Sequence, residues 1–161
     1  MKRLILLFSL LPFISYSQYT AIPDQYFEQE LIYLGYDNVI DGQVLTSNIS
    51  GVNSLYISYN NISDLTGIED FTALTYLNLM ANDLTSLDVS QNTALTELFC
   101  SYNQLTSLDV SQNTTLVKFN CEDNQLTSLD VSQNTSLTYL DCGSNQLTSL
   151  DLSQNTALTY L

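Results

Sequence analysis

Apolar residues return at a nearly fixed interval over the last two thirds of the chain. The repeated position is occupied in turn by Leu55, Leu77, Leu98, Phe119, Leu140 and Leu161. The first interval is 22 residues and each later interval is 21. A fixed period of this length is typical of a solenoid, in which each repeat is one coil that buries its apolar side only by stacking on its neighbours. The pattern therefore predicts one elongated domain with five coils and the start of a sixth.

Each coil opens with two apolar residues separated by one variable residue, which is the period of a short strand whose alternate side chains face inward. Further apolar positions, such as Leu84, Leu87 and Val89 in the second coil, are expected to point back into the core. Each coil is too short to hold a full helix as well. We therefore expect irregular or 3₁₀ structure on the outer side.

Two asparagines recur in the coils. The first stands five residues after the repeated apolar position, where the chain must turn with its backbone groups buried between coils. An amide both donates and accepts hydrogen bonds, so we expect these residues to bond to adjacent coils as a ladder: Asn60, Asn82, Asn103, Asn124 and Asn145. The second asparagine closes the coil and is expected to be a turn residue: Asn92, Asn113, Asn134 and Asn155.

The first 53 residues lack the repeat. Residues 1–17 combine a basic start, an apolar run from Leu4 to Ile14 and a small–x–small site at 15–17, which is typical of a secretory signal peptide and too short for a membrane span. A buried N-terminal helix or an uncleaved anchor is the alternative. Residues 18–53 are expected to form an end cap, because the first coil would otherwise expose its apolar cross-section. Residues 54–161 are expected to form the repeats.

Within the cap, a short helix is expected after Asp24, which would cap it. Phe27, Leu31 and Leu34 then share one face, and Gly35 ends the helix. Residues 37–42 have some features of a calcium loop, but the third position is valine, so a tight turn with a positive φ at Gly42 is favoured.

The repeat L-x-L-x-x-N-x-L-x-x-L resembles that of leucine-rich-repeat proteins. The copy from Asn61 to Leu79 is similar to the 22-residue units of bacterial internalins, and the later copies resemble repeats of secreted Bacteroidetes proteins. The resemblance implies an α/β solenoid, a horseshoe segment with a parallel β-sheet on its concave face and little helix on its convex side. The sequence stops at Leu161, the first core position of a sixth coil, and no capping segment follows, so we expect the chain to be a fragment. Proteins that it resembles often continue into further repeats and a type IX secretion sorting domain.

The charge of the chain limits its partners. It carries 17 acidic residues, three basic residues and no histidine, and removal of the signal peptide would leave Lys118 as the one basic residue. Such a surface repels phosphate backbones and anionic headgroups, so we expect no nucleic-acid binding and no membrane insertion after cleavage. A basic protein, a neutral glycan or a divalent cation would be compatible partners.

Cys100, Cys121 and Cys142 take the second inward position of their coils, where Ile57 and Leu79 stand in the earlier copies. This replacement indicates a stack of buried thiols that act as small apolar side chains. One strained disulfide or a thiolate metal site is the alternative.

The outward strand positions vary between copies, whereas core and turn positions hardly change. These positions pave the concave sheet of a leucine-rich repeat, and here they include several aromatic residues, which solvent does not require. Rigid aromatic rings with polar tips suit recognition of proteins or glycans. The alternative is that these positions vary because changes there are harmless, and that tyrosine occurs there because it favours strands. The candidate binding residues are Tyr56, Tyr59, Tyr76, Asn78, Met80, Glu97, Phe99, Tyr102, Lys118, Asn120, Glu122, Tyr139 and Asp141.

A row of aspartates also recurs, at Asp88, Asp109, Asp130 and Asp151. Equivalent residues of stacked strands lie about 4.8 Å apart, so these carboxylates repel one another unless each accepts hydrogen bonds in its own turn or a calcium ion bridges them. Local bonding is favoured, and we assign no metal or cofactor.

The sequence offers no recognisable catalytic arrangement. It has no histidine, and no serine or lysine stands in a nucleophile motif. We therefore expect a monomer without enzymatic activity, exported to the cell surface or the medium, that binds an extracellular protein or carbohydrate. A structural spacer or stalk that presents another domain is the rival interpretation.

The expected protein is thus a monomer without enzymatic activity and without a cofactor, and its binding surface is the concave face of the repeats.

Overall fold

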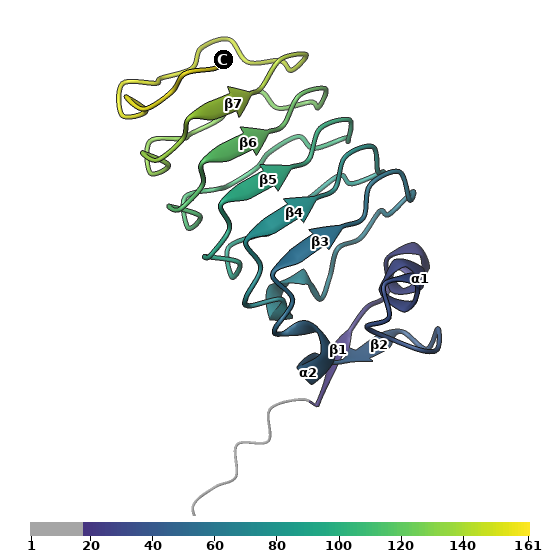
Figure 1. Ribbon diagram of the computed structural model, residues 1–161. Helices are drawn as coiled ribbons and strands as arrows, with labels where there is room; N and C mark the ends of the chain where they lie inside the picture. Colours follow the sequence, from purple (N-terminus) through teal and green to yellow (C-terminus); the bar gives the residue numbers. More distant parts are fainter. Residues whose placement is uncertain (1–17) are drawn as a thin grey trace, which may run out of the picture.

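The computed structural model describes residues 18–161, so the expected signal peptide at 1–17 lies outside the described residues. The repeats stack as successive coils, and each coil contributes one three-residue strand to a five-stranded parallel sheet along one side of the solenoid (Figure 1). The strands are β3 (Ser54–Tyr56), β4 (Tyr76–Asn78), β5 (Glu97–Phe99), β6 (Lys118–Asn120) and β7 (Tyr139–Asp141). The leucine-rich-repeat solenoid expected from the sequence is confirmed.

The register of the sheet follows the repeat. Leu55 pairs with Leu77, Leu77 with Leu98, and Leu98 with Phe119. Equivalent residues therefore stack in columns that run along the solenoid. An isolated parallel bridge joins Tyr139 to Tyr160 and continues the columns into the next coil. A row read from the sequence thus corresponds to a physical row on the molecule.

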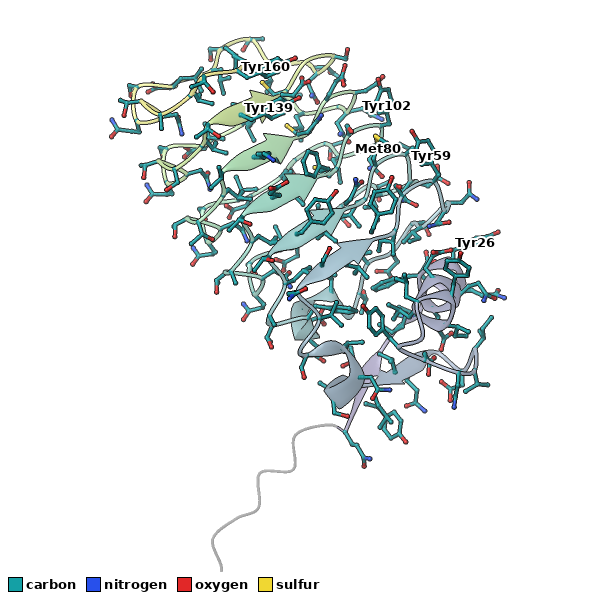
Figure 2. The ribbon with its side chains drawn as sticks, in the orientation of Figure 1. Tyr26, Tyr59, Met80, Tyr102, Tyr139 and Tyr160 are labelled. Carbon is teal, nitrogen blue, oxygen red and sulfur yellow. The ribbon has the colours of Figure 1, made fainter. Side chains whose placement is uncertain are left out.

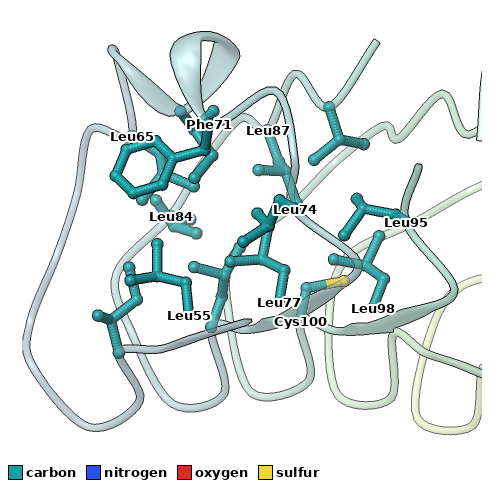
Figure 3. Packing of buried hydrophobic residues seen from close by; sticks show 14 of the residues in the cluster. Leu55, Leu65, Phe71, Leu74, Leu77, Leu84, Leu87, Leu95, Leu98 and Cys100 are labelled. Carbon is teal, nitrogen blue, oxygen red and sulfur yellow. The ribbon is translucent and has the colours of Figure 1, made fainter. Parts of the chain in front are cut away.

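The core is a continuous stack of the inward side chains, several of which Figure 3 shows from close by. Leu55, Leu77, Leu98 and Phe119 are fully buried, as the repeat predicts. Leu108 is the equivalent of Leu87 in the next coil and was therefore expected inside, but it is only partly buried and packs against the edge of the core. Because each coil is apolar on its inner side alone, burial comes from the neighbouring coils.

The cap contains two short strands and two helices. Strands β1 (Tyr19–Ala21) and β2 (Gln43–Leu45) pair in antiparallel fashion. Helix α1 (Gln25–Tyr33) lies between them in the chain, and helix α2 (Thr46–Ile49) follows β2. The expected helix is confirmed, with Asp24 as its N-cap. Leu34 is wrongly placed by the sequence pattern, because it lies just after the helix and is exposed, whereas Phe27 and Leu31 are fully buried.

Two carboxylates hold the cap together and fix it to the first coil. The buried Glu28 accepts hydrogen bonds from three consecutive backbone N–H groups at residues 41–43, and Gly42 has the expected positive φ of 83°. Asp24 accepts from the first turn of α1 with one oxygen and from Ser63 and Asp64 of the first coil with the other. The cap and the repeats therefore share one hydrogen-bonded joint.

The outer side of the solenoid contains little helix. A single 3₁₀ turn, η1 (Ile68–Asp70), lies there in the first coil, and the later coils turn without regular structure among the described residues. This agrees with the expectation from coil length. No helix of residues 18–161 is long and apolar enough to cross a bilayer.

Candidate binding face

The first asparagine row forms the expected ladder from Asn82 onward, whereas Asn60 of the first coil joins it only through its backbone N–H, which donates to Asn82 Oδ1. The Nδ2 group of Asn103 donates to the carbonyl oxygens of Leu79 at 3.0 Å and Cys100 at 3.1 Å, and its Oδ1 accepts from the backbone N–H of Leu84. Asn82, Asn124 and Asn145 repeat this pattern in their coils. Each amide thus satisfies buried backbone groups of two coils at once, which removes the cost of leaving them unpaired.

The second asparagine row forms another ladder, which the sequence reasoning missed by treating these residues only as turns. Asn113 is fully buried, and its Nδ2 donates to the carbonyl oxygens of Val89 at 2.9 Å and Asn92 at 3.0 Å in the preceding coil. Asn134 and Asn155 donate in the same way, each to the coil that precedes its own. The identity of the residue in every copy was the available signal, because a solvent-exposed turn would tolerate other polar residues.

The candidate binding residues lie on the outward side of the sheet and at its edge. Tyr56, Tyr59, Tyr102 and Lys118 are exposed, and most of the others are half-buried against their neighbours. Two aromatic pairs link neighbouring coils. The rings of Tyr76 and Phe99 lie 5.7 Å apart at their centroids, and those of Tyr139 and Tyr160 stack at 4.4 Å.

Some of the candidate polar residues also serve the backbone. Asn78 is buried, and its Oδ1 accepts from the N–H of Met80 at 3.0 Å. Asn120 and Asp141 accept in the same way from the residue two positions later, at 2.9 Å and 3.2 Å. Because these side chains close the turn after each strand, Asn78 in particular offers little surface to a ligand.

The residues that follow the strands adopt a left-handed backbone. Tyr59, Ala81, Tyr102, Asp123 and Ser144 form one column, and all have φ between 50° and 63°. The backbone N–H groups of the first four donate to the next coil, for example that of Tyr59 to the carbonyl of Met80 at 2.9 Å. Tyr59 and Tyr102 therefore stand outside the strands, at 66% and 48% exposure. A preference of tyrosine for strands cannot explain tyrosine at these two positions.

The charges on this face are mostly negative. Lys118 Nζ lies 3.2 Å from Glu97 Oε1, in an exposed pair that contributes little to stability. The charge of Glu122, with burial and the charges of Asp123 and Asp141 as further causes, raises the pKa of the Tyr102 phenol above its usual value. The region around Tyr102 therefore has a negative potential.

The cysteines stack in the core as free thiols. Cys100 and Cys121 are fully buried and Cys142 is half-buried, and no disulfide joins them. Burial raises the pKa of the Cys100 thiol to about 12 and also raises the pKa values of the other two. The favoured interpretation, a column of thiols that act as apolar side chains, is confirmed for the described chain.

The aspartates of the repeated row accept hydrogen bonds within their own turns, which is the alternative that the sequence favoured. The Oδ1 atoms of Asp88, Asp109, Asp130 and Asp151 each accept from the backbone N–H of the serine two residues later, at 2.8 to 2.9 Å. These hydrogen bonds lower the pKa of each carboxyl group. Among residues 18–161, no group of three or more histidine, cysteine or acidic side chains is placed to hold a metal ion.

Comparisons with solved structures agree with this fold. The functional domain of InlJ from Listeria monocytogenes, which includes a cysteine ladder, matches 92% of the chain with 41% identity and a TM-score of 0.84. The internalin InlF from the same species matches 88% with 25% identity and a TM-score of 0.76. A leucine-rich-repeat protein of Leptospira interrogans matches 71% with 29% identity and a TM-score of 0.68. No protein-family model and no curated protein matches the chain.

The chain spans only part of these neighbours, namely 34% of InlJ, 43% of InlF and 31% of the Leptospira protein. Their likeness shows that the chain has the internalin-like fold of bacterial leucine-rich-repeat proteins. Folds of this kind are protein-interaction modules in general and typically have no enzymatic activity.

Proposed function

We propose that the protein is an exported recognition module that binds an extracellular protein or glycan through the outward face of its parallel sheet. The observation that carries the proposal is the contrast between rows on the same coils. Core and ladder positions repeat almost unchanged, whereas the outward positions vary and hold the aromatic pairs Tyr76–Phe99 and Tyr139–Tyr160. Paired rings bury much area on contact at a low cost in side-chain entropy.

Export rests on the sequence of residues 1–17 and on the likeness to internalins, and the resemblance of the later repeats to secreted Bacteroidetes proteins supports the same proposal. The stacked thiols fit this setting. They resemble in kind the cysteine ladder of InlJ, and their burial protects them from oxidation. A mass measurement of the protein recovered from the medium of a producing cell tests export, since cleavage after residue 17 is expected. Retention of the full chain inside the cell would contradict it.

A combined alanine variant of Tyr76, Phe99 and Tyr139 tests the binding face. The purified protein is screened against a glycan array and a panel of extracellular protein domains, and the variant is compared for each partner found. We expect loss of binding with an unchanged circular dichroism spectrum. A matched control is the alanine variant of Tyr26 and Tyr33, two exposed tyrosines of α1. Equal binding by both variants would show that the partner binds another surface. If the unaltered protein bound none of the glycans or protein domains, the rival interpretation, a structural spacer, would be favoured.

A further inference from the structure

In the left-handed column at the end of the strands, one small residue separates two tyrosines. Tyr59 and Tyr102 occupy the same position in coils that are separated by one coil, and the residue between them is Ala81, whose side chain is a single methyl group. Figure 2 shows Tyr59, Met80 and Tyr102 along the same edge of the sheet. We call Tyr59, Ala81 and Tyr102 the tyrosine slot.

The backbone of the slot is held at a defined spacing. Tyr59 donates to the carbonyl of Met80, Ala81 to that of Ser101, and Tyr102 to that of Glu122, at 2.9 to 3.0 Å. Neighbouring strands lie about 4.8 Å apart, so the two tyrosine backbones stand roughly 10 Å apart. A cation interacts favourably with an aromatic ring within about 6 Å of its centroid. A group midway between two rings at this spacing is within reach of both.

The tyrosines are not explained by the fold. A left-handed backbone favours glycine, asparagine or aspartate and disfavours bulky side chains, yet both positions hold the largest residues of their column. Both rings are also largely exposed, so they contribute little to the core. Ser58, which precedes Tyr59 and lies in an outward column, is buried, and its hydroxyl has no hydrogen-bond partner among the described residues. The slot thus combines a left-handed backbone with exposed rings, and it lies next to a buried polar atom that has no hydrogen-bond partner.

The surroundings of the slot favour a positive charge. Glu122, Asp123 and Asp141 act on Tyr102 from the following coils, and Tyr59 also interacts with it electrostatically. Lys118, the one basic residue of 18–161, is paired with Glu97 and leaves these three carboxylates without a cationic partner. Carboxylates next to aromatic faces favour binding of ammonium or guanidinium groups over neutral ones.

We propose that the tyrosine slot binds an arginine or lysine side chain of a partner protein, held between Tyr59 and Tyr102 and opposite Glu122 and Asp123. This inference rests on the proposed function, because it names the chemical class of partner for the same face. It selects a protein with an exposed basic residue over a neutral glycan. The bound charge would also compensate the repulsion among the acidic residues of this edge.

The test uses two fluorescein-labelled peptides of equal length, Gly-Ser-Gly-Arg-Gly-Ser-Gly and the same peptide with citrulline, a neutral isostere of arginine. Binding to the purified protein is followed by anisotropy at fixed ionic strength. We expect the arginine peptide to bind about tenfold more tightly than the citrulline peptide. Y59A/Y102A should lose this preference, and E122Q/D123N should reduce it. Y26A/Y33A and D88N/D109N, which remove exposed rings or charges elsewhere, should keep it.

Two results would overturn the inference. One is an arginine preference that persists in Y59A/Y102A, and the other is an equal loss in D88N/D109N, which would indicate general attraction to an acidic surface. Neither result bears on the alanine variant of Tyr76, Phe99 and Tyr139. If that variant still loses its partner while the protein binds the arginine and citrulline peptides equally, the proposed binding face is supported and the proposed cation site is wrong. If the protein prefers the arginine peptide but the alanine variant of Tyr76, Phe99 and Tyr139 binds its partner normally, the tyrosine slot is supported and the proposed binding face is wrong.

Discussion

Two neighbouring rows of residues have opposite behaviour along the solenoid. The fifth residue after each repeated leucine is always asparagine, as at Asn103, whereas the fourth is tyrosine, alanine, aspartate or serine, as at Tyr102. The two rows are adjacent in sequence and belong to the same turn. Asn103 makes four hydrogen bonds to backbone groups, and Tyr102 directs an exposed ring to solvent.

The difference shows where the fold leaves freedom. The asparagine row satisfies buried groups of two coils, so a change there leaves several donors and acceptors unpaired. The preceding row requires only a left-handed backbone, which asparagine or glycine would adopt at least as easily as tyrosine. The side chains of that row are therefore available for recognition. Substitutions in the two rows should separate stability from binding.

Asn103→Ala should give the largest loss of stability. It removes the donor for the carbonyls of Leu79, Cys100 and Ser101 and the acceptor for the N–H of Leu84. Leaving buried groups unpaired costs about 1–3 kcal/mol each before relaxation, so we expect the free energy of unfolding to fall by about 2–4 kcal/mol. Urea denaturation measures this change. Gln104→Ala, on the exposed neighbour, should change it by less than about 0.5 kcal/mol. Similar losses for the two variants would refute the role of the ladder.

Asp24→Ala should give the next largest effect, because the joint between cap and first coil depends on one carboxylate. Its loss removes the N-cap of α1 and the hydrogen bonds from Ser63 and Asp64. We expect a fall of about 1–3 kcal/mol in the free energy of unfolding at pH 7. Thr85→Ala, a change at an exposed position of the second coil, is the control.

The pH dependence of the Asp24 joint follows from its pKa. Burial raises the pKa of Asp24, but the hydrogen bonds from Ser63, Phe27 and Asp64 together lower it below its usual value. A lowered pKa in the folded state means that the ionised form stabilises the fold above the unfolded value of about 4, and this stabilisation is lost as the pH falls through the folded value. Urea denaturation from pH 7 to pH 3 should show a smaller decrease for Asp24→Ala than for the unaltered protein. The same decrease in both proteins would contradict the role of the Asp24 carboxylate in the joint.

Much of the fold was predictable because the repeats provide an internal comparison. The 21-residue spacing identified the parallel sheet, and replacement of Leu79 by Cys100 and Cys121 in later coils identified a core position. The partial exposure of Leu108 and the exposure of Leu34 were not predictable from periodicity alone. Each lies at the edge of an apolar element, where exposure depends on which neighbouring segment covers it.

The candidate site was predictable in outline and not in detail. Variation between copies selected the outward columns, but it did not reveal that Asn78 closes its own turn or that Asn113 belongs to a second buried ladder. Nor did it reveal that Tyr59 and Tyr102 lie outside the strands. These features depend on backbone conformation at single residues, which residue type determines only weakly when tyrosine occupies a left-handed position.

Tyr102→Asn should have the smallest effect on stability and the clearest meaning for the comparison between rows. Asparagine adopts φ near 55°, the value found at Tyr102, with less strain than tyrosine, and the exposed ring contributes little burial. We expect the free energy of unfolding to stay the same or to rise by up to about 1 kcal/mol in urea denaturation. The same variant should weaken the arginine preference of the peptides. A fall in stability comparable to that of Asn103→Ala would show that the tyrosine is required by the fold, and the division between the two rows would then be wrong.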